Sequence, residues 1–393
     1  MTKSSRSQVN PYFYWACFIT YLAVLYARTR HSVTRLPSDP GYSYIQDGAD
    51  AGLESLLSGD PYLHVAARSL AWVTSWFPLT VQAVVLATLV HLVWAGCAVI
   101  IARVGWLETH SRVVMLLAGL ALVAAPHASE SSLGNIGNVK WPLLTAVLVM
   151  CASALAVQRV KAPALTLMTV TGLTNPLTIL CLLPLCYTAW RRADARVRAI
   201  RLAGVCLLAF IVQLTKVGLL DASSGHSSKV TEPWDGMGLF WWSGLLGPIT
   251  LSILVLVVIT ALYAAKRGMN DTAIVLGFTA ILVTVASYQM GGIADRYFVA
   301  PMTLAVIAAI LVIRSANIPT GVKRLASIVG LTVLLIPSVK WFSMGWYMTG
   351  GPTWAQEVRR ADELCTRSSK ADVEIALTPS GTVTLSCNRI ARD

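Results

Sequence analysis

Apolar residues fill most of the chain in long runs that do not alternate with polar positions. A transmembrane helix needs about 20 mostly apolar residues, and solid runs of this length do not fit the alternating strands of a β-barrel. We therefore predict an all-α fold, a polytopic transmembrane helical bundle of about eleven spans. The predicted spans are residues 11–28, 80–103, 112–126, 141–157, 163–174, 176–190, 202–220, 241–264, 272–290, 298–313 and 325–342.

Two neighbouring spans are unusually short. Residues 163–174 and 176–190 are separated only by Asn175-Pro176. We expect a broken or re-entrant pair of helices here, because interrupted backbone is tolerated at membrane depth only inside a bundle or beside a cavity. The alternative is that Asn175-Pro176 forms a simple turn.

The first long polar segment, residues 29–79, follows the first span and is rich in acids. Asp60-Pro61 has the residue types of a helix start, with Asp as N-cap and Pro in the first turn. We predict a helix from Tyr62 to Phe77, whose tryptophans and polar stripe favour a position at the membrane interface. This exterior loop belongs to a predicted transmembrane domain that covers residues 1–342.

The second polar segment is the tail, residues 343–393, for which we predict a small loop-and-strand appendage outside the membrane. Cys365 and Cys387 lie on either side of a strand-like stretch, residues 373–385. In an oxidising compartment we expect these two cysteines to form a disulfide. The other six cysteines lie in or beside spans, where cysteine behaves as a small apolar residue.

The composition restricts the class of protein. Apolar residues make up 55% of the chain, charged residues 13%, and the mean hydropathy is +0.64. Soluble domains average about 25% charged residues. These values exclude a soluble enzyme, a disordered chain and a DNA-binding domain.

The net charge of +12 is sorted between the two sides of the predicted bundle. With the N-terminus in the cytoplasm, sixteen of the 31 basic residues and three of the nineteen acids fall on the cytoplasmic side. The positive-inside rule then predicts a multi-pass plasma-membrane protein with a cytoplasmic N-terminus and an extracytoplasmic C-terminus. Topology explains the positive charge, so we expect the lipid bilayer and no nucleic acid as partner. We interpret the first span as an uncleaved signal anchor.

Two acids of the first exterior loop are the sharpest candidates for chemistry. Asp47 and Asp50 are three positions apart, so on a helical turn they share a face. Such carboxylates can act as a general base or hold a divalent metal that binds a phosphate. The alternative is a solvated acidic loop without chemistry.

Further polar residues are predicted at the outer side of the bundle. His64 and Arg68 could hold an anionic head group, or could simply extend their polar ends to the membrane surface. Asp295-Arg296-Tyr297 could contact a lipid phosphate or form ordinary rim charges. A short loop rich in Gly and Asn leads into Trp141 and is either part of a site or only turn-forming sequence. Its polar candidates are Glu130, Asn135, Asn138 and Lys140.

Several function classes find no support in the sequence. It has no phosphate-binding P-loop, no Gly-x-Ser-x-Gly, no His-Glu-x-x-His and no dinucleotide fingerprint. All nineteen acids fall in predicted loops, span ends or the tail. A proton- or sodium-coupled carrier usually needs acids at the membrane midplane, so their absence there weakens the transporter interpretation.

A set of short segments, in order along the chain, matches a known family. They are Gln46-Asp47, residues 61–68, Glu130, residues 134–141, Thr174-Asn175-Pro176 with Leu183-Pro184, Arg296-Tyr297-Phe298 with Pro301, and the tail from Trp354 through Cys365 to Cys387. With these segments the chain resembles the GT-C class of integral membrane glycosyltransferases, and within it an actinobacterial group of glycosyltransferase-like proteins. These enzymes use polyprenyl-phosphate sugars as donors outside the cytoplasm.

The resemblance implies roles for the candidate residues. An acid of the first exterior loop deprotonates the acceptor hydroxyl, with Asp47 the first choice and Asp50 the second, and transfer inverts the anomeric configuration. The implied donor-phosphate contacts are His64, Arg68, Lys140 and Arg296. The implied substrate-binding residues are Tyr62, Glu130, Asn135, Asn138, Trp141, Asn175 and Tyr297, of which Tyr62 and Trp141 could stack on sugar. The acceptor would be a glycan, lipid or protein of the cell envelope.

One departure from the family pattern leaves two roles open. Many members of the class carry two adjacent acids in this loop, whereas Asp47 is followed by Gly48. The identity of the base and the need for a divalent metal, Mg or Mn, therefore stay open. The rival functions are a transporter or flippase for a lipid-linked sugar, and a non-catalytic envelope assembly protein.

Overall fold

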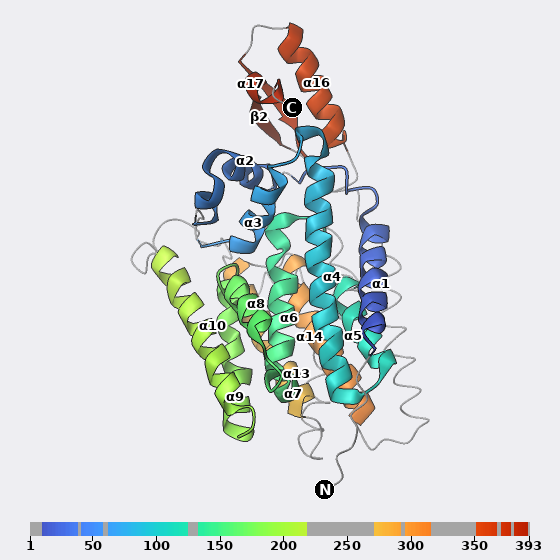
Figure 1. The fold of residues 1–393 in the computed structure, drawn as a ribbon, viewed down its shortest axis with the longest axis vertical. Coiled ribbons are helices and arrows are strands. Elements are labelled where there is room, and N and C mark those ends of the chain that lie inside the picture. Colours follow the sequence, from blue (N-terminus) through green and yellow to red (C-terminus); the bar gives the residue numbers. More distant parts are fainter. Residues whose placement is uncertain are drawn as a thin grey trace.

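A computed structural model describes residues 10–37, 41–57, 62–124, 133–217, 271–291, 295–315, 351–367, 371–378 and 381–391. These residues form a helical bundle that carries smaller elements at one end (Figure 1). The bundle helices are α1 (Pro11–Thr29), α4 (Gln82–Thr109), α5 (Arg112–Val123), α6 (Lys140–Ala152), α7 (Ala154–Val157), α8 (Ala162–Gly172), α9 (Leu182–Arg191), α10 (Arg196–Val217), α13 (Asp271–Gly291) and α14 (Val299–Ser315).

Helices occupy nine of the eleven predicted spans, and the other two, 241–264 and 325–342, lie outside the described residues. Two helical segments, Leu79–Thr109 and Arg196–Lys216, are long and apolar enough to cross a membrane. Five further apolar helices in the described part of the chain are shorter, at 10–17 residues. The predicted helical class is therefore confirmed, and a bundle of eleven spans stays a prediction.

One predicted span is interrupted. The apolar run 141–157 suggested a single helix, but α6 ends at Ala152 and α7 begins at Ala154. The hydroxyl of Ser153 caps α7 by accepting a hydrogen bond from Ala156 N, and it donates one to Glu108 Oε1 at 2.5 Å. Glu108, in the last turn of α4, also accepts from the Thr272 hydroxyl at 2.9 Å. A polar junction between α4, α7 and α13 thus breaks the helix, a tertiary cause that hydropathy cannot reveal.

The break predicted at Asn175-Pro176 is present. The helix α8 ends at Gly172, and a 3-10 segment, η5 (Pro176–Cys181), precedes α9. The side chain of Asn175 caps η5 by accepting from Leu177 N at 3.0 Å. Pro176 occupies the first position of η5, where its missing N–H is not needed.

The predicted first exterior loop contains α2 (Gly41–Ala51), a 3-10 segment η1 (Gly52–Leu57), α3 (Val65–Thr74) and a 3-10 segment η2 (Leu79–Val81). The predicted helix from Tyr62 to Phe77 is thus shorter, and its expected start at Asp60-Pro61 lies outside the described residues. One side of α3 packs on α2, η1 and α4, and its expected position at the membrane interface stays a prediction. Its buried face consists of Ala66, Ala67, Arg68, Ala71 and Thr74.

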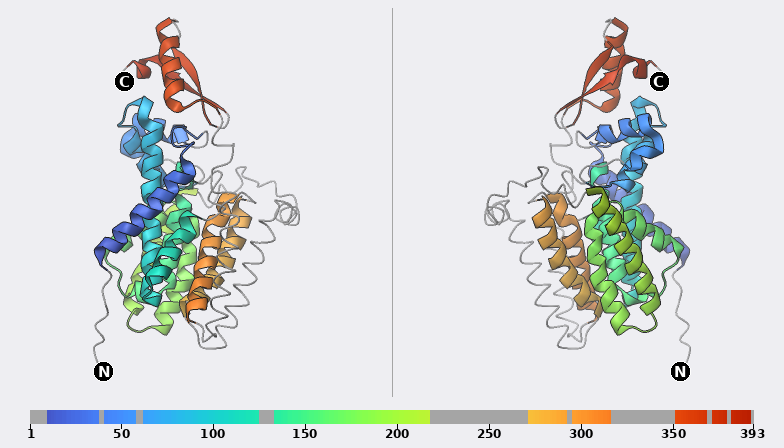
Figure 2. Two further views of the ribbon diagram at one scale, coloured as in Figure 1. Left: turned by 90° about the vertical axis from the view of Figure 1, so that its right-hand side faces the viewer. Right: turned by 90° about the vertical axis from the view of Figure 1, so that its left-hand side faces the viewer.

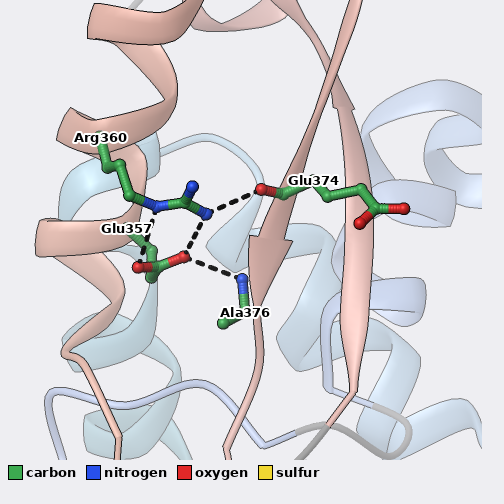
Figure 3. Close-up of polar contacts among 4 residues, drawn as sticks. All are labelled: Glu357, Arg360, Glu374 and Ala376. Atoms are coloured by element: carbon green, nitrogen blue, oxygen red, sulfur yellow. Dashed lines mark hydrogen bonds and ion pairs between the residues drawn. The ribbon is translucent and has the colours of Figure 1, made fainter.

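The tail is a compact unit of α16 (Trp354–Arg367), the antiparallel strands β1 (Asp372–Ala376) and β2 (Thr382–Ser386), and α17 (Cys387–Ile390). The hairpin adds a small β element to the predicted all-α class. A disulfide joins Cys365 to Cys387, as the sequence predicted. Figure 3 shows a second link, in which the Glu357 carboxylate accepts bonds from the Arg360 guanidinium and from Ala376 N of β1.

The tail packs on the first exterior loop. Backbone hydrogen bonds run from Trp354 N to Thr34 O and from Thr378 N to Leu36 O. The buried Trp354 indole also donates to Leu79 O at 2.5 Å, at the start of η2. Two views show the tail, α2 and α3 stacked at one end of the bundle, while the α9–α10 turn lies at the other (Figure 2).

Candidate functional site

The candidate site lies where the predicted first exterior loop meets one end of the bundle helices. The helix α2 packs on α3, and α3 contacts the 3-10 segment η4 (Ile136–Asn138), which leads into α6. The segment η5 packs on α6, and a further 3-10 segment, η6 (Asp295–Phe298), packs on α13 and α14. Segments that are far apart in the sequence thus converge on one place.

An ion pair joins α2 to α3. Arg68 Nη1 donates to Asp47 Oδ2 at 2.9 Å and to Ser55 O at 3.1 Å. The guanidinium also lies over the Tyr44 ring, 4.6 Å from its centroid. The Arg68 side chain is buried, at 8% exposure, whereas the Asp47 side chain is 46% exposed. A fixed cation therefore holds an accessible carboxylate in one orientation.

The close approach of the two helices depends on Gly48. A Cβ at this position would lie 2.8 Å from Trp72 Cα and 3.1 Å from Trp72 N. No side chain fits between these backbones. The missing second acid beside Asp47 thus has a physical reason, because position 48 lies against the α3 backbone and leaves no room for a side chain.

A stack of rings extends the site from α3 to α6. The ring centroid of His64 lies 4.4 Å from that of Tyr62 and 5.9 Å from that of Tyr44. On Tyr62, the phenol accepts a hydrogen bond from Lys140 Nζ at 2.7 Å. The Lys140 ammonium also lies 5.4 Å from the Tyr62 ring centroid and 5.6 Å from that of Trp141. The Tyr62 ring therefore contacts both the Lys140 ammonium group and the His64 imidazole.

Trp141 connects these residues to η6. Its ring meets that of Tyr297 edge to face, with the centroids 5.2 Å apart. The two asparagines of the preceding loop are buried, and Asn135 caps η4 by accepting from Gly137 N at 2.9 Å. Contacts therefore connect, in this order, Asp47, Arg68, Tyr44, His64, Tyr62, Lys140, Trp141 and Tyr297.

The helix α3 is capped from a distant segment. Its first N–H groups are normally satisfied by a side chain at the N-cap position, here His64. Instead, Ala66 N donates to the Thr174 hydroxyl at 2.9 Å and Val65 N donates to Leu173 O at 3.3 Å. His64 makes no side-chain cap bond to α3, so its imidazole is left for other contacts.

The histidine is uncharged. Burial lowers the pKa of His64 to about 3, and the positive charges of Lys140 and Arg68 act in the same direction. A neutral imidazole cannot supply positive charge to a phosphate. The expected contact of His64 with the donor phosphate stays a prediction, limited to a hydrogen bond from its N–H group. The described cations beside the ring stack are Lys140 and Arg68.

Four expected site residues carry buried polar atoms that are not satisfied. Within the described part of the chain, seven buried side-chain N or O atoms lack a hydrogen-bond partner. Four of them are His64 Nδ1, Arg68 Nε, Trp141 Nε1 and Asn175 Nδ2. Native proteins satisfy nearly all such atoms, and an exception calls for an explanation such as a bound ligand. The unsatisfied polar atoms therefore concentrate in the region that the sequence selected.

Three expected residues are not brought into the site by the described atoms. Asp50 is exposed in the last turn of α2, and its charge acts on Tyr42 instead. Glu130 lies outside the described residues. Arg296 belongs to η6, but its side chain lies outside the described part of the structure.

A metal site with several protein ligands is not found in the described ranges. No group of three or more His, Cys, Asp or Glu side chains gathers there. The acids of α2 that could take part are the half-exposed Asp47, which is paired with Arg68, and the exposed Asp50.

Three further residues contribute to the site, of which Tyr44 and Thr174 were given no role from the sequence. Tyr44 contacts both Arg68 and His64, and its place three positions before Asp47 on α2 was an available signal. Thr174 caps α3. Gln213, on α10, fixes the entry to α3 by accepting from Leu63 N at 2.9 Å and donating to Leu63 O at 3.2 Å.

The sequence matches no protein-family model, and no curated protein is significantly similar to it.

Proposed function

We propose that the chain is an integral membrane glycosyltransferase that moves a sugar from a polyprenyl-phosphate donor to a cell-envelope acceptor. The observation that carries the proposal is the half-exposed Asp47 carboxylate, held by the buried Arg68, in continuous contact with the ring stack and ammonium of His64, Tyr62 and Lys140. A transferase of this kind needs a fixed base for the acceptor and a cation for the leaving phosphate.

Asp47 is the general base of the proposed reaction. Its carboxylate takes the proton of the acceptor hydroxyl, whose oxygen forms a bond to the anomeric carbon of the donor sugar. The bond from that carbon to the phosphate oxygen breaks on the opposite face, so the configuration inverts. The electron pair of the broken bond leaves with the polyprenyl phosphate, whose charge Lys140 is placed to neutralise.

Arg68 is a positioning residue in this scheme. Its Nη1 is already bonded to Asp47 and to Ser55 O, so it acts through the carboxylate instead of through the phosphate. The ion pair fixes the orientation of the Asp47 carboxylate, which a base requires. Lysine would keep the charge but lose the planar stacking on Tyr44.

The proposed site faces the outside of the plasma membrane. The α9–α10 turn lies at the opposite end of the bundle from α2, α3 and the tail (Figure 1), and in and beside it lie the basic residues Arg191, Arg192, Arg196, Arg198 and Arg201. This separation supports a cytoplasmic N-terminus and an extracytoplasmic tail by the positive-inside rule. The disulfide of the tail is consistent with an oxidising compartment.

Direct assay of the purified full-length protein in lipid nanodiscs tests the proposal. Synthetic farnesyl-phosphate-linked hexoses and pentoses serve as donors, and a panel of octyl glycosides serves as acceptors. We expect a new glycoside and one equivalent of farnesyl phosphate, and addition of Mg or Mn or of a chelator shows whether metal is required. Movement of intact donors across the membrane of proteoliposomes without bond cleavage would instead identify a flippase. The absence of both activities would favour an assembly protein.

A further inference from the structure

The imidazole of His64 has an unusual position in the site. His64 is only 8% exposed, and the centroid of its ring lies 4.4 Å from that of Tyr62 and 5.9 Å from that of Tyr44. In the described structure its Nδ1 is buried and has no hydrogen-bond partner. A buried nitrogen that is left without a bond costs folding free energy, so its retention needs a reason outside the fold.

The local structure does not supply that reason. An N-cap residue stabilises a helix when its side chain accepts hydrogen bonds from the first N–H groups of that helix. Thr174 and Leu173 already satisfy those of α3, so capping does not require the histidine. Packing alone does not require it either, because a phenylalanine would present a ring of similar size to Tyr62 and Tyr44.

Positive charge is not the reason. The charged and titratable groups around the ring are Arg68 on α3, Lys140 on α6, Tyr44 on α2 and Tyr62 in the segment before α3. Burial and the two cations keep the imidazole neutral at physiological pH. A neutral imidazole offers one donor and one acceptor nitrogen, which suits a group such as a hydroxyl that can both donate and accept.

The surroundings select the class of ligand. A sugar combines apolar C–H faces with hydroxyl groups, and here a polar nitrogen lies beside two aromatic rings. The neighbouring ammonium of Lys140 is the group suited to an anion. We propose that His64 is an uncharged specificity-determining residue whose Nδ1 forms a hydrogen bond with a hydroxyl group of the sugar substrate. This inference rests on the proposed transferase function.

Three substitutions separate the nitrogen from the ring and from the charge. His64→Phe keeps a ring but removes both nitrogens, His64→Asn keeps a polar group near the position of Nδ1, and His64→Lys supplies a cation. We expect kcat/KM for transfer from farnesyl-phosphate-linked sugars to fall about 10- to 100-fold in His64→Phe, less in His64→Asn and at least as much in His64→Lys. Full activity in His64→Lys together with loss in His64→Asn would overturn the proposal in favour of a cationic role.

Deoxy sugars identify the hydroxyl. Donors and acceptors that each lack one hydroxyl are compared in the wild type and in His64→Phe. We expect the wild type to transfer one deoxy sugar much more slowly than the parent sugar that carries the hydroxyl. His64→Phe should transfer this deoxy sugar and its parent at the same rate, because the variant has already lost the hydrogen bond to that hydroxyl. A donor with this behaviour places the hydroxyl on the transferred sugar, and an acceptor with this behaviour places it on the acceptor. Equal discrimination by both proteins in both series would overturn the proposal.

Thermal stability distinguishes this role from a structural one. The melting temperature of unliganded His64→Phe in nanodiscs is expected to equal or exceed that of the wild type, because the variant removes an unsatisfied buried nitrogen. A lower melting temperature that accounts for the lost activity would overturn the proposal. A wild type that transfers sugar alongside an equally active His64→Phe overturns this inference alone, whereas an inactive wild type overturns the proposed function and the inference with it.

Discussion

Gly48 lies so close to Trp72 that a Cβ at position 48 would approach the Trp72 Cα to 2.8 Å. The next residue toward the N-terminus is Asp47, and its partner Arg68 lies one helical turn before Trp72. The tight crossing of α2 over α3 and the geometry of the ion pair therefore depend on each other. Any residue other than glycine at position 48 must separate the two helices.

Gly48→Ala is expected to destabilise the protein and to lower transfer activity. Overpacking of this kind costs about 1–3 kcal/mol, and a shift of α2 moves Asp47 away from Arg68. Denaturation in detergent and the transfer assay measure the two effects.

Gly96→Ala is the matched control for this substitution. Gly96 also lies in a helix, α4, but a Cβ there meets nothing within 4 Å. The control is expected to be neutral or stabilising by up to about 1 kcal/mol because alanine favours helix. If Gly48→Ala proves as harmless as Gly96→Ala, the helix crossing is not as described.

The tail is expected to loosen at acid pH. Hydrogen bonds from Arg360, supported by one from Ala376 N, hold the pKa of Glu357 below its usual value, although burial opposes them. In the unfolded chain this carboxyl has an ordinary pKa of about 4.3. Its stabilising contribution is therefore complete above that value and is lost as the pH falls through the lower folded pKa.

Hydrogen exchange at the Ala376 amide, corrected for the intrinsic effect of pH, measures this loss. Protection is expected to fall between neutral pH and pH values below about 4 in the wild type. Glu357→Gln should show weaker protection that changes little with pH. Glu363→Gln, an exposed glutamate on the same helix, should behave as the wild type. A wild-type profile without acid loss would contradict the link between Glu357 and β1.

The proposed orientation predicts which end of the bundle is accessible from outside the cell. Ala49 is exposed on α2, and Ala193 is exposed in the α9–α10 turn at the opposite end. In a background that carries Cys186→Ser, because Cys186 is exposed, we expect an impermeant maleimide to label Ala49→Cys in intact cells. Ala193→Cys should be labelled only after permeabilisation. The reverse pattern would invert the topology and remove the site from the outside.

Much of the fold could be predicted because its signals are local. Apolar runs located the helices, Asn175-Pro176 located a break, and the two cysteines of the tail located the disulfide. The start of α3 could not be found in the same way, since Thr174, 108 residues after Ala66, caps it. The break at Ser153 likewise depends on Glu108, which belongs to another helix.

In the candidate site too, residue types could be predicted from the sequence, whereas tertiary contacts could not. Sequence reasoning selected Asp47, Arg68 and His64 from their residue types and spacing. It predicted phosphate contacts for both Arg68 and His64, which stay predictions. It did not predict that Arg68 pairs with Asp47 or that His64 is buried in a neutral state. Charge pairing and desolvation are properties of the packed chain, so a residue type alone does not determine them.

The rate of sugar transfer by Asp47→Asn tests the central claim most directly. Asparagine keeps the shape of the side chain and can still meet Arg68, but it cannot accept the proton of the acceptor. With melting temperature and expression as measures of folding, we expect kcat to fall about 10²- to 10⁴-fold, while the exposed tail variant Asp362→Asn stays fully active. Wild-type rates in a folded Asp47→Asn protein, or the large loss appearing in Asp50→Asn instead, would contradict the assignment of Asp47 as the base.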